Sequence, residues 1–518
     1  MVPLIVVATV GATVPNYGSP EQQRLAREQL DVIRRQPYRP RQIADQFSHG
    51  INSHLPHGVS SRVQPSRYVK DEICQLVIDK VPGVSDQQFQ QFRDMLRDYA
   101  PHTVAYSLDD ITGYTGVEPP VTINLDTTAR IFIPARRNWT PAEEPIVDEK
   151  VQELLAGADP VCVRVAESDY ACNPTLAMKR APNGEWSDKR FCINFIPINR
   201  HTELDRYGSH KTEVMLQRVV KGRFLTALDL RSGFHQIPMH PDHICKTAFW
   251  WSTSLQPPQL VAYKRMPFGL KNASAKFQRV MDAELARFNC TEFAFAYIDD
   301  LIIVSDTWED HVKHVKAVLH MLKECNLKIH PEKSVFATDV VEYLGHNIIG
   351  RYGIAMNESK VEAIKSLPEP KNVPDLRSIL GFLSYYRHFI PGFSALTAPM
   401  TKLLKKEQPF VWGIDQREAY AELRRLMTTP GLVLRPPDPK RQFILHTDWS
   451  NYGIGAVLGQ LDDDGNEYLS PATPAHSTNM RRTTPATRAS CLPLPGQSSP
   501  SAATSTAPAS SSSRTISR

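Results

Sequence analysis

The chain has 518 residues, enough for two to four domains, and 41% of them are hydrophobic, so a large core can be buried. The formal charge is only +5, from 60 basic and 55 acidic side chains, which neither demands nor excludes a nucleic-acid partner. The eight cysteines form no Cys-x-x-Cys pair, which argues against a zinc finger and favours reduced thiols over a disulfide scaffold.

The first 200 residues contain little that points to chemistry. The initial run MVPLIVVATVGATV is apolar, but it lacks a basic flank and is too short to span a bilayer. We therefore expect a soluble, intracellular and cytoplasmic protein with no membrane partner, although no residue encodes a compartment. Residues 1–115 are rich in Gln and Arg, with helical stretches over 22–35 and 87–99, and residues 116–200 change to short strands and proline-rich turns.

Residues 220–350 carry the clearest periodicity of the chain. The elements predicted there are a strand over 224–230, a turn and helix after MPFGL at 266–270, a hairpin within FAFAYIDDLIIVS at 293–305, an amphipathic helix from Glu309, and strand-like segments over 335–336 and 343–349.

The C-terminal part is helical over 374–426 and then forms two predicted strands, FILHTD and YGIGAVLGQ. The last 48 residues, 471–518, differ in kind, because 34 of them are Ser, Thr, Ala or Pro and none is Asp or Glu. Such a composition cannot bury enough apolar surface to fold, so it predicts a disordered tail.

Two adjacent carboxylates, Asp299 and Asp300, lie in the middle of the apolar stretch 293–305. At about 4 Å and an effective dielectric near 20, two like charges repel by roughly 4 kcal/mol, so a positive partner is expected. A divalent metal ion is the usual one. The alternative is a β-hairpin whose tip happens to be Asp-Asp. Asp229, 70 residues before Asp299, ends another apolar strand, although a strand-end Asp is also a common turn former.

Carboxylates on separate strands are what two-metal nucleotidyl transfer requires. One ion lowers the pKa of a primer 3′-hydroxyl and the other holds the triphosphate, with the ions about 3.5–4 Å apart. Magnesium prefers oxygen ligands and keeps several waters, so two or three Asp residues suffice. We therefore expect two Mg²⁺ ions, for which Mn²⁺ could substitute.

Several longer segments carry a recognisable pattern. They include KRAPNGEWSDKRFCINFIPIN, FLTALDLRSGFHQIPM, MPFGLKNASAKFQRVM, YIDDLIIVS, PEKSVF, YLGH, LRSILGFLSYYRHFIPGFS and FILHTDWSNYGIGAVLGQ. In order over roughly residues 118–460, they resemble the reverse transcriptase of gypsy-type LTR retrotransposons. The resemblance implies an RNA-directed DNA polymerase, cut from a polyprotein, that binds deoxynucleoside triphosphates and an RNA or DNA template with its primer.

The implied fold class is α+β, a right-hand polymerase of fingers, palm and thumb, with a connection and an incomplete ribonuclease H-like fold. The implied divisions are an N-terminal region of unknown role at 1–115, fingers and palm at 116–350, thumb and connection at 351–440, a truncated ribonuclease H-like segment at 441–470, and the tail at 471–518.

The resemblance also assigns roles to the carboxylates. Asp229, Asp299 and Asp300 correspond to the metal-binding residues of the palm. Because adjacent side chains on a strand point to opposite faces, we expect Asp229 and Asp299 to be direct ligands and Asp300 to tune the site. Lys333 matches a lysine that protonates the leaving pyrophosphate, although an exposed Lys before a strand is otherwise unremarkable.

The remaining implied residues would surround the nucleotide and the primer. Phe234 would lie under the incoming sugar and exclude a ribose 2′-hydroxyl, while an Arg fork binds phosphate oxygens in pairs. The structural alternatives are a core Phe and a solvated Arg. The nucleotide-binding set is Arg180 (or its neighbour Lys179), Arg190, Phe234, Gln236, Phe268 and Gly269, and the primer-binding set is Leu344, Gly345 and His346.

Three features depart from the family pattern. Asn194 stands where the family usually has Asp, and Ile196 where it often has Arg. Asp448 would be the first carboxylate of the ribonuclease H-like site, but no acidic residue follows Glu467, so we expect no ribonuclease H activity. A further hypothesis is that the tail is an out-of-frame translation of the rest of that domain. Translating the other two reading frames of the coding DNA tests it, and the absence of a nuclease-like continuation from both frames would contradict it.

Two rival functions remain at this stage. An RNA-dependent RNA polymerase would share the architecture, although Phe234 argues against it. A catalytically inactive retroelement remnant that at most binds nucleic acid would explain the shortened nuclease. His311 and His314 lack a cysteine pair, so we expect surface positions on a helix and no zinc site. The oligomeric state is not predicted.

Overall fold

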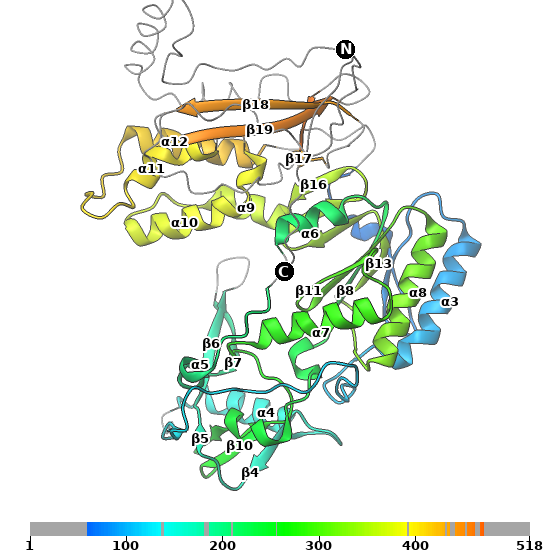
Figure 1. Cartoon of the computed structure of the whole chain (residues 1–518), viewed down its shortest axis with the longest axis vertical. Helices are drawn as coiled ribbons and strands as arrows, with labels where there is room; N and C mark the ends of the chain where they lie inside the picture. The colour runs from blue at the N-terminus through cyan, green and yellow to red at the C-terminus, as the bar shows by residue number, and fades with distance from the viewer. Residues whose placement is uncertain are drawn as a thin grey trace, which may run out of the picture.

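The computed structural model describes residues 60–135, 139–180, 186–208, 211–254, 256–390, 393–429, 432–435, 441–450, 453–461 and 467–470. The helix expected over 22–35 and the tail 471–518 lie outside the described residues. An upper lobe of helices, a central sheet and a lower lobe of short strands are visible in Figure 1. None of the described helices is both long enough and apolar enough to cross a membrane.

A six-stranded mixed sheet, in the order β1-β2-β13-β8-β12-β11, forms the centre of the molecule. Its antiparallel core consists of β8 (Phe224–Asp229), β12 (Asp300–Ser305) and β11 (Ala294–Tyr297), whose apolar residues are buried. The helices α7 (Ala273–Arg287) and α8 (Trp308–Glu324) lie side by side against these strands (Figure 1). This is the α+β arrangement expected for a palm.

Residues 68–103, for which the sequence indicated no role, belong to this central sheet. β1 (Tyr68–Lys70) pairs antiparallel with β2 (Val77–Asp79), which in turn runs parallel to β13 (Val335–Thr338). The helix α3 (Asp86–Thr103) then packs against α8, where the rings of Phe92 and Trp308 meet edge to face at 5.3 Å. The palm therefore depends on a segment well before the recognisable motifs.

The lower lobe, where the sequence predicts the fingers, is built from small β units and two helices, and the units are antiparallel except for one parallel pair. These are the sheet of β4 (Cys162–Val165), β10 (Gln259–Tyr263) and β9 (Phe249–Trp251), the hairpin of β6 (Pro174–Arg180) and β7 (Trp186–Ile193), the parallel pair β3 (Ile131–Phe132) and β5 (Tyr170–Ala171), and the helices α4 (Glu144–Leu155) and α5 (Ile196–His201).

The upper lobe joins the palm through α6 (Thr212–Val219) and a second sheet. That sheet contains β14 (Val340–Tyr343), β15 (His346–Ile349), β16 (Gly353–Met356) and β17 (Val433–Leu434). Four helices follow along the chain: α9 (Glu358–Ser366), α10 (Val373–Tyr385), α11 (Phe393–Lys402) and α12 (Ile414–Met427).

The expected nuclease segment is a strand pair extended by a third strand. β18 (Phe443–Ser450) pairs with β19 (Gly453–Leu461), and β19 also pairs with the short β20 (Glu467–Ser470). Asp448 lies in β18, opposite Gly455, but its side chain is outside the described residues.

Most predicted elements of the palm are confirmed, with one local exception. α3 covers the helix expected at 87–99 and begins at a capping box formed by Ser85 and Gln88. His311 was expected on a helix surface, and this is wrong, because the ring is completely buried. Its Nε2 lies 2.8 Å from Thr226 Oγ1 and its Nδ1 lies 3.0 Å from Ser305 Oγ. The hydroxyls of Thr226 and Ser305, both on strands, therefore satisfy the hydrogen-bonding atoms of a histidine that was expected at the surface.

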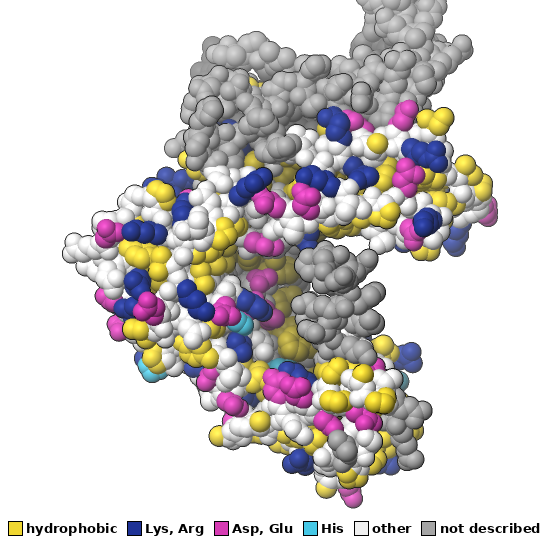
Figure 2. Space-filling view, turned by 180° about the vertical axis from the view of Figure 1, so that it is seen from behind, with side chains coloured by type: hydrophobic (Ala, Val, Ile, Leu, Met, Phe, Trp, Pro, Cys, Tyr) yellow, Lys and Arg dark blue, Asp and Glu magenta, His cyan; other side chains and the backbone are white. Residues whose placement is uncertain are grey.

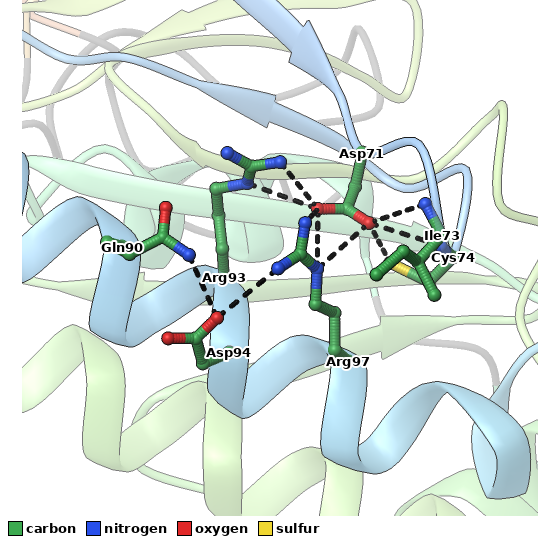
Figure 3. A network of polar contacts seen from close by, with 7 residues as sticks. All are labelled: Asp71, Ile73, Cys74, Gln90, Arg93, Asp94 and Arg97. Atoms are coloured by element: carbon green, nitrogen blue, oxygen red, sulfur yellow. Dashed lines mark hydrogen bonds and ion pairs between the residues drawn. The ribbon is translucent and has the colours of Figure 1, made fainter.

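A buried carboxylate ties the N-terminal segment to α3. Asp71 has a fully buried side chain that accepts hydrogen bonds from Arg93 and Arg97, and from the backbone amides of Ile73 and Cys74 (Figure 3). Burial alone would raise the pKa of Asp71, but the arginines and amides outweigh burial and hold the pKa well below its usual range. The charged form is therefore the one that stabilises the fold.

We predict that Asp71→Asn lowers the free energy of unfolding by about 2–4 kcal/mol at pH 7, because two half-buried guanidinium groups lose their charged partner. Asp94 is the matched control, since it bonds Gln90 and Arg97 in the same network but is 60% exposed. Asp94→Asn should change stability by less than about 1 kcal/mol. Urea unfolding of both variants is the measurement, and equal losses would contradict the assignment.

Candidate active site

The adjacent carboxylates lie at a tight hairpin between β11 and β12. Tyr297 pairs with Asp300, so Ile298 and Asp299 alone form the turn, and Asp300 begins the return strand. The tip is therefore Ile-Asp and not the Asp-Asp considered from the sequence. Ile298 has φ of 56°, a left-handed conformation that is a clear outlier for a β-branched residue. Such backbone persists only where the surroundings impose it.

Gln278 on α7 imposes this turn from below. Its Oε1 accepts a hydrogen bond from Ile298 N at 2.9 Å, and its Nε2 donates to Ala296 O at 2.9 Å. The same Nε2 lies 2.9 Å from Asp282 Oδ1, and the side chain is only 2% exposed. The amide thus fixes both sides of the hairpin end. No sequence pattern points to it, because a glutamine on a helix is ordinarily solvated.

The register of the sheet brings the third carboxylate to the same place. Asp300 pairs directly with Asp229, and directly opposed residues of antiparallel strands share one face. We expected Asp229 and Asp299 to be the direct metal ligands and Asp300 to tune the site, because side chains alternate along a strand, and this assignment of ligands remains a prediction. Since Asp299 lies in a turn, that argument does not apply to it, and Asp300 is the residue beside Asp229.

Asp299 instead points toward a glycine on the next segment. A Cβ built on Gly233 would lie 2.5 Å from Asp299 Oδ1, so only glycine leaves room for this carboxylate. Gly233 opens the short 3₁₀ helix over Gly233–Gln236, after Ser232 with φ of 47°. The close approach involves residues 66 positions apart, which is why no local pattern reveals it.

The charges of the three carboxylates repel one another, so a bound cation would stabilise the site. Asp299 Oδ1 is buried without a hydrogen-bond partner. Burial, and then the charges of Asp300 and Asp229, raise the pKa of Asp299 to about 7. Partial desolvation and the Asp229 charge also raise the pKa of Asp300. The nearest positive group is Lys333, whose Nζ lies 3.7 Å from Asp229 Oδ1.

This donor set fits a hard divalent cation, because it offers only carboxylate oxygens and one of them is orphaned in the interior. In the part of the chain that the structure describes, no group of three or more His, Cys, Asp or Glu side chains lies close enough together to hold a metal ion. A closed cage is not required, since magnesium keeps several waters and shares its ligands with a substrate.

Two neighbouring cavities open beside the carboxylates. One, of about 630 Å³, is lined by Asp229, Asp300, Lys333, Leu344 and Gly345, among others. The other, of about 910 Å³, is lined by residues that include Arg231, Ser232, His235, Phe268 and Lys333. Lys333 borders both cavities. The expected primer-binding residues Leu344 and Gly345 therefore line the same cavity as Asp229 and Asp300. The expected nucleotide-binding residue Phe268 lines the neighbouring cavity.

The surface around the site is mixed in charge. Seen from behind, the molecule is hollowed between the upper and lower lobes, and basic, acidic and hydrophobic side chains alternate along the hollow (Figure 2). This agrees with a formal charge of only +5 over the whole chain.

The other nucleotide-site candidates are distributed unevenly. Phe234 is 8% exposed and packs against Phe268 at 5.1 Å and Phe277 at 5.6 Å, while Phe268 is 48% exposed. Gly269 O accepts a hydrogen bond from Asn199 Nδ2 at 2.8 Å. The exposed ring of Phe268 and the covered ring of Phe234 form one aromatic wall.

Gln236 does not have the expected position beside a nucleotide. Its side chain is completely buried, with Nε2 donating to Arg231 O and Lys328 O and Oε1 accepting from Lys328 N. Both ends of the side-chain amide are hydrogen-bonded to backbone groups, so Gln236 stabilises the segment that carries Phe234. The side chains of Arg180 and Arg190 lie outside the described residues, although their backbones form β6 and β7.

The central sheet, its two covering helices and the carboxylates at its edge have the α+β arrangement of a right-hand polymerase fold. Residues 189–348 match the reverse transcriptase (RNA-dependent DNA polymerase) family, and residues 412–494 match the RNase H-like domain found in reverse transcriptase. The chain therefore contains a reverse transcriptase domain. The second match crosses the divisions expected at residues 440 and 470, which remain predictions.

The relatives agree with the resemblance to gypsy-type elements. The Pol polyprotein from transposon gypsy of Drosophila melanogaster is 36% identical over 327 residues, covering 61% of this chain and 30% of that protein. The Tf2-3 polyprotein of Schizosaccharomyces pombe is 32% identical over 321 residues, covering 62% of this chain and 23% of that protein. The chain thus spans at most about 30% of the length of these relatives.

Solved structures show the same fold. A foamy viral protease-reverse transcriptase in complex with double-stranded DNA superposes with a TM-score of 0.62 at 19% identity, covering 81% of this chain and 83% of that chain. The same kind of protein in complex with an RNA/DNA hybrid gives 0.60 at 19% identity, covering 76% of this chain and 51% of that chain.

We predict a pH-dependent stability gap between Asp299→Asn and the unaltered chain, both measured in EDTA. The folded pKa of Asp299, about 7, lies above the unfolded value near 4. Stability from the bound proton is therefore present below pH 4 and lost as the pH rises through 7. The asparagine variant has no such loss. Its free energy of unfolding, relative to that of the unaltered chain, should therefore rise by about 1–3 kcal/mol from pH 5 to pH 8. A constant gap in urea unfolding would contradict the raised pKa.

Proposed function

We propose that this chain is an RNA-directed DNA polymerase that adds deoxynucleotides to a primer 3′-end. The observation that carries the proposal is the orphaned, buried Asp299 carboxylate beside the Asp229–Asp300 pair, inside a reverse transcriptase domain. Neighbouring like charges, one of them with a buried and unpartnered oxygen, oppose folding unless a cation is to be held there. An inactive remnant would gain nothing from keeping them.

We infer that Asp229, Asp299 and Asp300 hold two Mg²⁺ ions, with Mn²⁺ as an effective substitute. When bound, the ions would lower the pKa of the primer 3′-hydroxyl and neutralise the leaving pyrophosphate. Asp229 and Asp300 line the same cavity, and Asp299, in the turn directly before Asp300, points toward Gly233. We propose that all three carboxylates contribute to one metal site.

Phe268 lines the larger cavity, which supports a role for it beside the nucleotide, and Phe234 packs against its ring. Phe234 and Phe268 would pack against the incoming sugar and base, with Gly269 next to them. A bulky ring at Phe234 leaves no room for a ribose 2′-hydroxyl, which favours deoxynucleotides over the substrates of an RNA polymerase. Arg180 and Arg190, from the β6–β7 hairpin, would hold the triphosphate, since Arg binds phosphate oxygens in pairs.

Lys333 would donate a proton to the departing pyrophosphate. Its side chain is 62% exposed and borders both cavities, with Nζ within reach of the Asp229 carboxylate. This location joins the cavity of Asp229 and Asp300 to the cavity of Phe268. A positioned general acid there would assist bond cleavage.

The template would be an RNA or DNA strand paired with a primer. The solved relatives of the same fold are complexes with an RNA/DNA hybrid and with double-stranded DNA. An RNA/DNA hybrid adopts A-like geometry, so recognition would act through backbone and 2′-hydroxyl contacts and not through base sequence. We propose no ribonuclease H activity, because residues 468–518 contain no Asp or Glu that could complete a two-metal site with Asp448.

We predict that the full chain extends a DNA primer on an RNA template with deoxynucleotides and Mg²⁺, and that ribonucleotides do not replace them. Asp299→Asn should lower the rate at least about 100-fold, the scale seen when a preorganised charge is removed from an active site. Asp306→Asn is the matched control, because Asp306 follows the other end of β12, is 66% exposed and pairs only weakly with Arg351. A folded chain that extends no primer would overturn the proposal.

We further predict that the RNA template stays intact during this reaction. End-labelled RNA in the same hybrid, followed on a denaturing gel, reports any cleavage directly. Cleavage that persists in Asp299→Asn but disappears in Asp448→Asn would show that the nuclease segment is active and would contradict the proposed absence of ribonuclease H activity.

A further inference from the structure

The turn between β14 and β15 is held in an unusual backbone conformation. Tyr343 pairs with His346, leaving Leu344 and Gly345 as a two-residue loop. Their φ values are 49° and 70°, so both lie in the left-handed region, as a type I′ turn requires. Gly345 adopts this conformation freely, but Leu344 does not, so neighbouring groups have to stabilise the turn.

Two consecutive tyrosines at the end of α10 supply that support. Tyr385 donates its hydroxyl to Leu344 O at 2.8 Å, and Tyr386 donates to Gly345 O at 3.1 Å. Both carbonyls of the turn are therefore bonded to the thumb helix. Tyr386 is 2% exposed and cannot leave the core easily, whereas Tyr385 is 46% exposed at the lobe surface.

His346 completes the contact from the palm side. Its Nδ1 lies 2.8 Å from Leu344 O, which can only accept, so the proton is on Nδ1. Burial lowers the pKa of His346 to about 4, which keeps the ring neutral near pH 7. The ring centroid lies 5.3 Å from those of Tyr385 and Tyr386 and 5.9 Å from that of Phe389. Aromatic packing thus locks the ring between the turn and α10.

The held turn faces the proposed site of chemistry. Leu344 and Gly345 line the same cavity of about 630 Å³ as Asp229 and Asp300. Any movement of α10 that breaks the two tyrosine bonds would shift the turn relative to the carboxylates. Reaction rates respond steeply to such shifts, since a misplacement of about 1 Å can lower a rate about 100-fold.

We propose that Tyr385 and Tyr386 are positioning residues, which couple the thumb to the catalytic cavity by holding the Leu344–Gly345 turn and, through it, the primer end. This inference rests on the proposed polymerase function. The tyrosines touch neither substrate nor metal in this account. They set the distance between the primer 3′-hydroxyl and the Asp229–Asp300 edge.

The test uses the full chain with both hydroxyls removed, Tyr385→Phe together with Tyr386→Phe, which keeps the rings that pack on His346. Tyr420→Phe is the matched control, because Tyr420 in α12 of the same lobe donates to Pro368 O at 3.0 Å and Leu367 O at 3.3 Å, away from the turn. The readouts are single-turnover deoxynucleotide incorporation, primer–template affinity, and amide hydrogen exchange over residues 343–347.

For the double variant we expect a 10- to 100-fold slower single-turnover rate, with the nucleotide concentration for half-maximal rate and the primer–template affinity unchanged within about twofold. Exchange over 343–347 should accelerate in this variant alone. Tyr420→Phe should leave the rate within about twofold of the unaltered chain, although it removes a comparable hydroxyl.

Three outcomes would overturn the inference in distinguishable ways. A double variant with the unaltered chain's rate and exchange leaves the polymerase standing and removes the positioning role. An equal rate loss in Tyr420→Phe shows general weakening of the thumb. An unaltered chain that extends no primer overturns the proposed function itself, and the inference with it.

Discussion

The hydrogen bonds of the Gln278 amide are the interaction on which the active site depends. Left-handed backbone at a non-glycine residue costs about 1–2 kcal/mol, and carboxylates at about 4 Å repel by roughly 4 kcal/mol. Gln278 offsets part of this by bonding Ile298 N and Ala296 O from within the core. The register of β12 on β8 then places Asp300 beside Asp229. The hairpin turn and the strand register together bring the carboxylates of Asp229, Asp299 and Asp300 to one edge of the central sheet, where a bound cation would offset their repulsion.

The sequence predicts the carboxylates and the strands that carry them, because both signals are local. It does not predict that Asp299 lies in the turn or that Gly233 makes room for it, since these depend on register and on contacts between distant segments. The predicted positions of Gln236 and His311 are wrong for the same reason. Each polar side chain lies inside the core, where hydrogen bonds to groups from other elements satisfy it. The palm strands of residues 68–79 were missed because each has only three residues and because β2 joins the sheet through a parallel pairing with the distant β13.

The two strained turns of the palm share a design. Ile298 is held by an amide from α7, and the Leu344–Gly345 turn is held by two tyrosine hydroxyls at the end of α10, one on each carbonyl. In each case a neighbouring helix imposes a conformation that the turn residues would not adopt alone, and in each case the turn borders the carboxylates. A thumb that moves with nucleic acid would act on one turn and leave the other fixed, so the primer end could be adjusted while the metal ligands stay in place.

The most direct test of the central claim, that the three carboxylates form a metal site, is Mn²⁺ binding followed by electron paramagnetic resonance at pH 8 without nucleic acid. The account predicts that the unaltered chain binds the ion and that Asp299→Asn weakens binding at least about tenfold, the loss expected when a charged oxygen ligand is removed. Equal affinity in the two proteins would contradict it, because the orphaned carboxylate would then have no part in holding a metal.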